Sequence, residues 1–265
     1  MIRLAANVSF LFGELPFLDR FAAARDAGFR AVEFTFVYDM PPGAIAQRCR
    51  AAGVRPVLMN APAGNLALGE TGTAAIPGRE GETRDAVDLA LHYARLIGVP
   101  RIHLLAGTPP TGADPAACER VFVANLRDAA DRAAADGVTI LIEPLNPCDR
   151  PGYFLPTARQ ACAILAKVAR PNVRLQLDLY HHQMAEGHPG RRLAGLLPTI
   201  EHVQIAGVPG RHEPDRGILD HRGLLGTLER LGYAGHVGCE YLPQAGTLAG
   251  LGWARPYLTP VAAIA

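Results

Sequence analysis

The sequence predicts a (β/α)₈ TIM barrel, an α/β fold built as one domain. Three observations support this prediction. Short apolar segments typical of buried strands recur eight times in 265 residues. Segments with helical spacing separate them, and several end at a glycine that directly precedes the next apolar segment, as at Gly53-Val54 and Gly137-Val138. No glycine-rich phosphate loop is present to favour an open sheet. Alternating strands and helices indicate parallel strands, and eight such units fit a closed barrel.

The predicted strands are short and rich in apolar and β-branched residues. They comprise residues 4–10, 31–34, 55–60, 101–105, 138–143, 173–178, 202–205 and 236–241. Helices with an apolar stripe are predicted between them, including residues 16–27, 83–97, 115–136 and 157–170. The sequence contains no linker or low-complexity segment that would divide it. We therefore expect residues 1–265 to form a single domain.

The composition favours a protein that acts on small molecules. The formal net charge is +1, and no basic run is interleaved with aromatic residues, so we expect no nucleic-acid partner. No apolar run reaches the roughly 18 residues of a membrane-spanning helix, and the first residues lack the features of a signal peptide. We expect a cytoplasmic protein with no membrane partner. A homo-oligomer is compatible with this composition, which leaves the oligomeric state open.

Cysteine and lysine usage excludes several kinds of chemistry. The five cysteines are scattered and never spaced as Cys-x-x-Cys, which argues against a disulfide framework and a zinc knuckle. The single lysine, Lys167, falls in a predicted surface helix. Because a Schiff-base enzyme needs a desolvated lysine in its pocket, we exclude Schiff-base aldolase and pyridoxal chemistry.

One predicted connection is much longer than the others. Residues 61–82 contain several glycines and prolines and show no periodicity. Their number exceeds the usual length of about 2 to 6 residues for a loop between a strand and a helix. Because this connection follows a strand, it lies on the face of the barrel where active sites form. We expect it to act as a lid; the alternative is an ordered surface loop.

Polar side chains end the last four predicted strands. These are Glu143, Asp178, Gln204 and Glu240. The carboxyl ends of all strands in a parallel barrel face one cleft, so the four side chains should converge. Three carboxylates close together repel one another, and a divalent cation removes that repulsion. Four oxygen ligands without a thiolate favour Mg²⁺ or Mn²⁺. The alternative is that these residues belong to separate hydrogen-bond networks.

Other polar residues near the same cleft are candidate substrate contacts. Those that end earlier strands, and are expected on the cleft floor, are Asn7, Glu33 and Asn60. His181 follows Asp178 by three residues and is expected to contact a substrate hydroxyl or carbonyl. Arg211 lies on the loop after the seventh strand, where its guanidinium can hold a substrate carboxylate. Arg79, on the predicted lid, is the alternative residue for that role.

The sequence resembles the hydroxypyruvate isomerase family, a branch of the sugar isomerase and endonuclease IV-like barrels. The resemblance extends over nearly the whole chain. Its motifs include Leu-Ile-Glu-Pro-Leu-Asn at 141–146, Asp-Leu-Tyr-His at 178–181, His-Val-Gln-Ile-Ala at 202–206 and Val-Gly-Cys-Glu-Tyr-Leu-Pro-Gln at 237–244. The resemblance implies a divalent metal at Glu143, Asp178, Gln204 and Glu240, with Glu143 and Glu240 as the acid and base pair. Ketose 3-epimerases are also similar but carry His where Gln204 stands.

The activity implied by this resemblance is that of a metal-dependent intramolecular aldose-ketose isomerase. The expected substrate is a small hydroxy-oxo acid, and the first choice is hydroxypyruvate, converted to 2-hydroxy-3-oxopropanoate (tartronate semialdehyde) through an enediolate. One alternative is a four-carbon acid such as 2-oxo-tetronate (2-dehydrotetronate). Another is a non-catalytic sugar-acid-binding barrel, which would have lost a carboxylate from the site. None of the expected carboxylates is missing here, and we therefore expect an enzyme.

Overall fold

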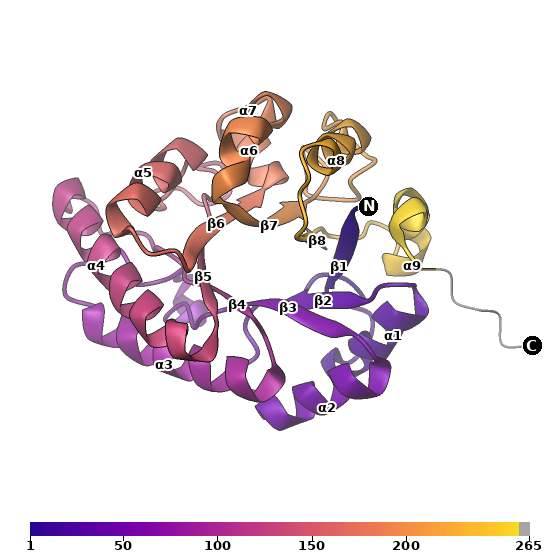
Figure 1. Cartoon of the computed structure of the whole chain (residues 1–265), viewed down its shortest axis with the longest axis horizontal. Helices are drawn as coiled ribbons and strands as arrows, with labels where there is room; N and C mark the ends of the chain where they lie inside the picture. The colour runs from indigo at the N-terminus through magenta and orange to yellow at the C-terminus, as the bar shows by residue number, and fades with distance from the viewer. Residues whose placement is uncertain (260–265) are drawn as a thin grey trace, which may run out of the picture.

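The computed structural model describes residues 1–259 and shows a closed barrel of eight parallel strands (Figure 1). The strands are β1 (Arg3–Asn7), β2 (Ala31–Phe34), β3 (Arg55–Asn60), β4 (Arg101–His103), β5 (Thr139–Ile142), β6 (Val173–Asp178), β7 (Ile200–Ile205) and β8 (His236–Cys239). Each strand pairs with its sequence neighbours, and β1 pairs with β8 to close the ring. The predicted (β/α)₈ barrel is confirmed.

Helices surround the ring of strands (Figure 1). They are α1 (Arg20–Asp26), α2 (Pro42–Ala52), α3 (Glu80–Ile97), α4 (Pro115–Ala133), α5 (Ala158–Val168), α6 (Leu179–Ala185), α7 (Pro189–Leu196), α8 (His221–Arg230) and α9 (Thr247–Gly250). Short 3-10 segments are η1 (Phe17–Asp19), η2 (Leu66–Leu68), η3 (Ala134–Asp136), η4 (Leu197–Thr199) and η5 (Leu251–Tyr257). Helix α4 illustrates why they form: the Asp114 carboxylate accepts from two backbone N–H groups at its start. Gly137, in the left-handed region, ends the η3 turn that follows it.

Three strands have the bounds that the sequence predicts, namely β2, β3 and β6. Four others end earlier than predicted, namely β1 at Asn7, β4 at His103, β5 at Ile142 and β8 at Cys239, and β7 begins two residues earlier, at Ile200. After β1 the chain turns, because the carbonyl oxygen of Asn7 accepts from the N–H groups of Phe10 and Leu11. Apolar residues directly follow β1 and β4, so apolar character alone overestimates the length of these two strands.

The apolar core has two parts. The larger part joins the strands to the surrounding helices, and the smaller one consists of strand residues, namely Ala5, Ala31, Val57, Leu58 and Leu141. One polar group is built into the barrel beside this core. A methyl group placed on Gly238 of β8 would lie 2.3 Å from both carboxylate oxygens of Glu33 on β2. Glycine at this position therefore leaves the space that a fully buried carboxylate occupies.

The long connection between β3 and α3 comprises residues 61–79, because α3 begins at Glu80, inside the predicted lid. Its second half is fixed to the barrel: Gly72 pairs with Ala106 in an isolated bridge, and the N–H of Ala75 donates to the carbonyl oxygen of Ala106 at 2.7 Å. Residues 64–69 form a continuous exposed stretch, in which Leu68 is 78% exposed, and residues 70 and 71 are partly exposed. We call residues 64–71 the lid tip.

The helices, the single lysine and the cysteines were each used above to exclude a class of protein. Within residues 1–259, no helix combines the length and apolar character needed to cross a membrane. Lys167 lies on the surface, where it pairs with Glu119. The five cysteines are free, and Cys148 is exposed, so the cysteines are not all buried small apolar residues.

Candidate active site

The polar residues that end the last four strands lie at one end of the barrel. Glu143 directly follows β5, Asp178 ends β6, Gln204 is next to last in β7, and Glu240 directly follows β8. The strand register places Asp178 beside Gln204 and Gln204 beside Gly238. The first three side chains are buried, and that of Glu240 is partly buried. The regular β/α repeat thus brings all four side chains to one place, as the sequence predicts.

Two amide side chains hold Glu240. Nε2 of Gln204 donates to Oε2 of Glu240 at 2.6 Å, and Nδ2 of Asn7 donates to the same oxygen at 2.8 Å. Both amides also donate to Oε1 of Glu33, at 2.8 Å and 3.1 Å. Oε1 of Gln204 accepts from Nε2 of Gln176 at 2.6 Å. The nitrogen of Gln204 therefore faces Glu240, and Gln204 can become a metal ligand only if its carboxamide turns over.

Glu33 is a buried anchor for this network. Besides the two amides, Nε2 of His202 donates to Oε2 of Glu33 at 2.6 Å. Three donors on one carboxylate offset much of the free-energy cost of burying its charge. The Glu33 carboxylate thereby fixes the amide of Gln204, which in turn orients Glu240.

Burial and mutual repulsion change the acidity of the site carboxylates. Burial, reinforced by the charges of Glu240 and Asp178, raises the pKa of Glu143 well above its ordinary value. Burial also raises the pKa of Glu240 to about 8 and that of Asp178 to about 6, although the neighbouring Arg211 opposes both shifts. Carboxyl groups with such values can both accept and release protons near neutral pH. A cation bound between them would lower these pKa values again.

The arrangement of donor atoms fits a cation. Oε1 of Glu143 and Oδ2 of Asp178 are buried and, among the described residues, receive no hydrogen bond. One potential ligand atom from each of Glu143, Asp178 and His181 lies within 4.8 Å of the others. Buried carboxylate oxygens without a donor are costly unless a positive charge is present. The structure therefore contains a possible metal site formed by acidic residues and a histidine.

His181 is held in one orientation by Asn146. The backbone N–H of Asn146 donates to Nδ1 of His181 at 3.3 Å, and Nδ2 of Asn146 lies 2.7 Å from the same atom. Burial lowers the pKa of His181 well below its ordinary value, so the ring is neutral. Because Nδ1 accepts, the ring proton is on Nε2, which lies 3.8 Å from Oδ2 of Asp178. This tautomer is better suited to donate a hydrogen bond to a substrate oxygen than to bind a metal.

Arg211 is already engaged with the site carboxylates. Its Nη2 donates to Oε1 of Glu240 and lies 3.6 Å from Oδ2 of Asp178. The guanidinium also lies over the rings of Phe10 and Tyr180, 5.2 Å and 5.4 Å from their centroids. In this structure the positive charge that the carboxylates require comes from Arg211.

A cavity of about 190 Å³ opens at this end of the barrel. Its lining includes Asn60, His103, Glu143, His181, Arg211 and Glu240. Pockets for drug-sized ligands occupy roughly 300 to 1,000 Å³, so this inner cavity suits a metabolite of only a few carbons. Asn60, a predicted substrate contact, lines the inner cavity from the end of β3.

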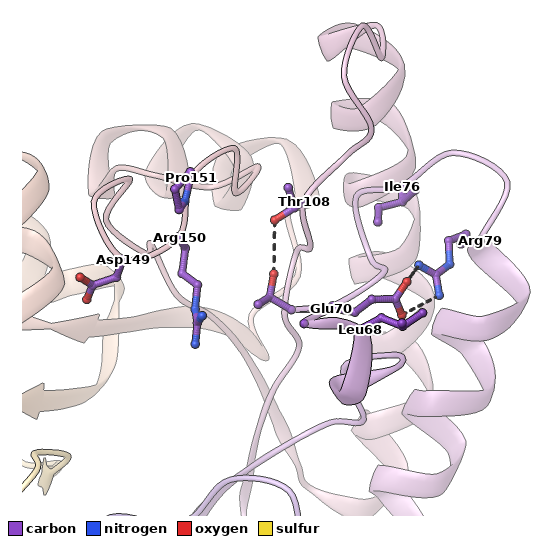
Figure 2. A pocket seen from close by; sticks show the side chains of 11 residues that line it. Leu68, Glu70, Ile76, Arg79, Thr108, Asp149, Arg150 and Pro151 are labelled. Carbon is purple, nitrogen blue, oxygen red and sulfur yellow. Dashed lines mark hydrogen bonds and ion pairs between the residues drawn. The ribbon is translucent and has the colours of Figure 1, made fainter.

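A second, outer cavity of about 380 Å³ shares Glu70, Thr71 and Arg150 with the inner one (Figure 2). Arg79 lines the outer cavity but is not part of the inner lining. Its Nη1 and Nη2 atoms donate to the two carboxylate oxygens of Glu70 at 2.5 Å and 3.0 Å, and Nη2 also pairs with Glu82 at 2.6 Å. Arg79 therefore ties the lid tip to the start of α3.

Three residues near the site are not predicted from the sequence, namely His103, Asn146 and Arg150. His103 ends β4 and lines the inner cavity. Because the apolar residues Leu104 and Leu105 follow it, the sequence predicts that the strand continues to residue 105. Asn146 and Arg150 lie on the turn after β5, where the N–H of Arg150 donates to the carbonyl oxygen of Asn146 at 3.0 Å. The turn-forming residues that directly follow Glu143-Pro144 are the signal that could have indicated these two.

Comparison with known proteins places this site in a family. A protein of Cupriavidus necator named 2-oxo-tetronate isomerase is 49% identical over 258 residues, which cover 97% of this chain and 99% of that protein. Hydroxypyruvate isomerase of Escherichia coli K12 is 42% identical, with coverage of 97% and 100%. A solved Brucella melitensis structure named AP endonuclease, family 2, is 47% identical, with a TM-score of 0.95 and coverage of 97% and 100%. The family model described as xylose isomerase-like TIM barrel matches residues 21–257, and the chain belongs to this family.

Proposed function

We propose that this protein is a metal-dependent isomerase that interconverts hydroxypyruvate and 2-hydroxy-3-oxopropanoate. The observation that carries the proposal is the pair of carboxylates, Glu143 and Glu240, in the lining of one small cavity. Burial raises the pKa of both groups, so each can take up a proton and release it again. Relatives named as isomerases, similar over nearly their whole length, support this assignment.

The reaction moves a proton between two neighbouring carbons. One of the two glutamates takes the proton from C3 of hydroxypyruvate, which leaves an enediolate, and the other supplies a proton to C2. The hydroxyl proton passes from O3 to O2. Each positioned acid or base contributes a rate factor of roughly 10² to 10⁴. The Nε2–H of His181 is suited to donate a hydrogen bond to the oxygen that gains negative charge.

The proposed metal ligands are Glu143, Asp178, Gln204 and Glu240, of which Gln204 requires its amide to turn over. Their oxygen donors favour Mg²⁺ or Mn²⁺. When bound, such a cation polarises the carbonyl and hydroxyl oxygens of the substrate and so acidifies the carbon-bound proton. The unsatisfied oxygens of Glu143 and Asp178 support this proposal.

The substrate carboxylate needs a cationic partner, and we assign this role to Arg211 in the inner cavity. A cation that neutralised Asp178 and Glu240 would weaken their hold on the guanidinium, which could then bind the substrate carboxylate. Asn60 contributes a polar contact from the cavity lining. Arg79 contributes through the lid tip, which it holds beside the cavity.

A second candidate substrate is the four-carbon acid 2-oxo-tetronate. The same acid and base pair can isomerise it, since the reacting carbons are alike. The outer cavity, which shares Thr71 and Arg150 with the inner one, offers space for an additional carbon. The relative from Cupriavidus necator carries this name.

Phosphodiester hydrolysis is a third possibility, raised by the name of the Brucella melitensis structure. Binding a nucleic-acid backbone requires a basic surface, whereas this chain has a formal net charge of +1. The inner cavity, of about 190 Å³, is also small for a nucleotide within a polymer. These observations favour isomerisation of a small acid.

The test of the proposed function compares kcat/KM for hydroxypyruvate and 2-oxo-tetronate with the purified, metal-loaded protein. A higher value for hydroxypyruvate supports the first assignment, and a higher value for 2-oxo-tetronate supports the second. Exchange of the C3 hydrogen with deuterated solvent would show proton abstraction directly. If neither acid is converted and neither exchanges its hydrogen, both assignments are wrong.

A further inference from the structure

We propose that His103 binds a substrate hydroxyl group and holds Glu143 in position, so that it contributes both to specificity and to catalysis. This inference rests on the proposed function, because it assigns a further residue to the same site. His103 is the polar residue at the end of β4, a strand for which the sequence predicts no site residue. It lines the inner cavity together with Glu143 and Glu240.

The position of His103 is fixed by the barrel. It pairs in register with Asn60 on β3 and with Leu141 on β5. Its carbonyl oxygen accepts from the N–H of Ala61 at 2.8 Å. The side chain is only 2% exposed. The ring is therefore presented from a rigid strand end, as a preorganised binding site requires.

The contacts of the imidazole are incomplete. Nδ1 lies 3.3 Å from Oε2 of Glu143, yet within residues 1–259 neither ring nitrogen has a partner that satisfies hydrogen-bond geometry. A buried polar atom without a partner costs roughly 1–3 kcal/mol. A lining residue that carries two such atoms indicates that a bound molecule completes its contacts.

The neighbouring Glu143 indicates which ring nitrogen of His103 contacts the substrate. A neutral imidazole has one donor and one acceptor nitrogen. Because the Glu143 carboxylate can only accept when it is ionised, as it would be beside a bound cation, the proton is assigned to Nδ1, which faces Oε2 of Glu143 at 3.3 Å. Nε2 is then the acceptor, and the complementary substrate group is a hydroxyl. A hydroxy-oxo acid carries a hydroxyl group next to its reacting carbonyl, whereas an unsubstituted oxo acid does not.

The test measures binding separately from turnover. Two non-reacting acids, glycerate and lactate, differ by the hydroxyl at C3, and their dissociation constants are measured by calorimetry on the metal-loaded protein. The wild type should bind glycerate about tenfold more tightly, which corresponds to about 1.4 kcal/mol for one hydrogen bond. His103→Leu should bind the two acids equally, and His103→Asn, which retains a polar group, should restore part of the preference.

His182 is a matched control. Like His103, it is buried, lies 3.3 Å from a glutamate and has no hydrogen-bond partner for its ring within the described residues. Unlike His103, it is not part of the lining of the inner cavity. His182→Leu should keep the wild-type preference for glycerate. With hydroxypyruvate, His103→Leu should also lower kcat about 10- to 100-fold, because Glu143 loses its neighbour.

The outcomes separate this inference from the proposed function. If His103→Leu and His103→Asn keep the wild-type preference for glycerate and the wild-type kcat, the role of His103 is wrong. A wild type that does not distinguish the two acids also contradicts it. If the wild type converts no oxo acid but prefers glycerate in a His103-dependent way, the assigned reaction is wrong and the binding role of His103 stands.

Discussion

Arg211 and Glu240 form an ion pair at the mouth of the barrel, and the same guanidinium nitrogen lies 3.6 Å from Asp178. Arg211 therefore provides positive charge to two of the residues proposed to bind a metal. The arginine and a divalent cation compete for the same negative charge. Removing the arginine should have opposite effects on metal binding and on substrate binding.

For Arg211→Met, we expect tighter binding of Mn²⁺ and weaker binding of the acid substrate. The affinity for Mn²⁺ should rise about tenfold, because a repelling charge beside the ligands is removed. KM for hydroxypyruvate should rise at least about tenfold, since the carboxylate loses its bidentate partner. Calorimetry with Mn²⁺ and steady-state kinetics measure the two effects. An unchanged KM would show that another residue holds the carboxylate.

Glu143→Gln should abolish isomerisation and stabilise the metal-free protein. Loss of an acid-base group should lower kcat at least about 10³-fold. Burial raises the pKa of Glu143, so its charge destabilises the fold at neutral pH, and a neutral amide of the same shape removes that cost. We expect the Tm measured in a chelator at pH 8 to rise by at least about 3 °C.

Glu240→Gln provides the comparison. It should lose activity to a similar extent but gain less stability than Glu143→Gln, because Arg211 offsets part of the cost of burying the Glu240 carboxylate. Near-normal turnover in either variant would rule out a mechanism based on two carboxylates. Equal Tm changes in both variants would contradict the assigned difference in their surroundings.

Removal of divalent metal should abolish turnover, and Mg²⁺ or Mn²⁺ should restore it. Because a cation binds the folded state and fills the space beside Glu143 and Asp178, it should also raise the Tm. At a metal concentration 100 times Kd, the free energy of unfolding should rise by about 2.7 kcal/mol. Differential scanning calorimetry with and without metal measures this. Full activity of a protein shown to contain no metal would exclude the cofactor.

The sequence was sufficient to predict the fold and the residues that meet at the site. Strands recur at regular intervals, and in a parallel barrel every strand end reaches the same face, so Glu143, Asp178, Gln204 and Glu240 could be grouped without knowledge of any contact. This reasoning depends only on the alternation of strands and helices. It failed at His103, because the apolar residues after it obscured where β4 ends.

The contacts made by loops could not be predicted in the same way. Arg211 has a positive φ of 57°, and its backbone N–H donates to the carbonyl oxygen of Gly207. This local turn, which residue types alone do not specify, directs the side chain toward Glu240. Likewise, Arg79 lies on the predicted lid, but its pairing with Glu70 depends on how the lid tip folds back.

The protein should lose stability as the pH falls below about 6.5, and His236 should account for part of this loss. Burial, with a further contribution from nearby cationic groups such as Arg3, lowers the pKa of His236 to about 4 from an ordinary value of 6.5. Between these values the unfolded state binds more protons, so the stabilisation present above pH 6.5 is lost as the pH falls toward 4. At pH 5 the loss should be about 1 kcal/mol, because solvent screens part of the effect at this partly buried side chain.

The variant His236→Gln separates this contribution from those of the other histidines. Urea unfolding at several pH values between 7 and 4.5 gives the free energy of unfolding for both proteins. As the pH falls, the free energy of unfolding should decrease less in the variant than in the wild type, because the variant has no group to protonate at this position. Parallel pH curves would show that His236 does not titrate differently in the folded and unfolded states.

The lid tip, residues 64–71, is held by the pairing of Arg79 with Glu70. Arg79→Met should leave the free energy of unfolding within about 1 kcal/mol of the wild type, since a partly exposed ion pair contributes little to global stability. Amide hydrogen exchange in the lid tip should become faster, and KM should rise because the tip no longer closes the cavity. Glu82→Gln is the control, because it removes the partner of Arg79 on α3 and leaves Glu70 in place. If Arg79→Met changes neither exchange nor KM, the tip is a static wall of the cavity and the pairing has no role in substrate binding.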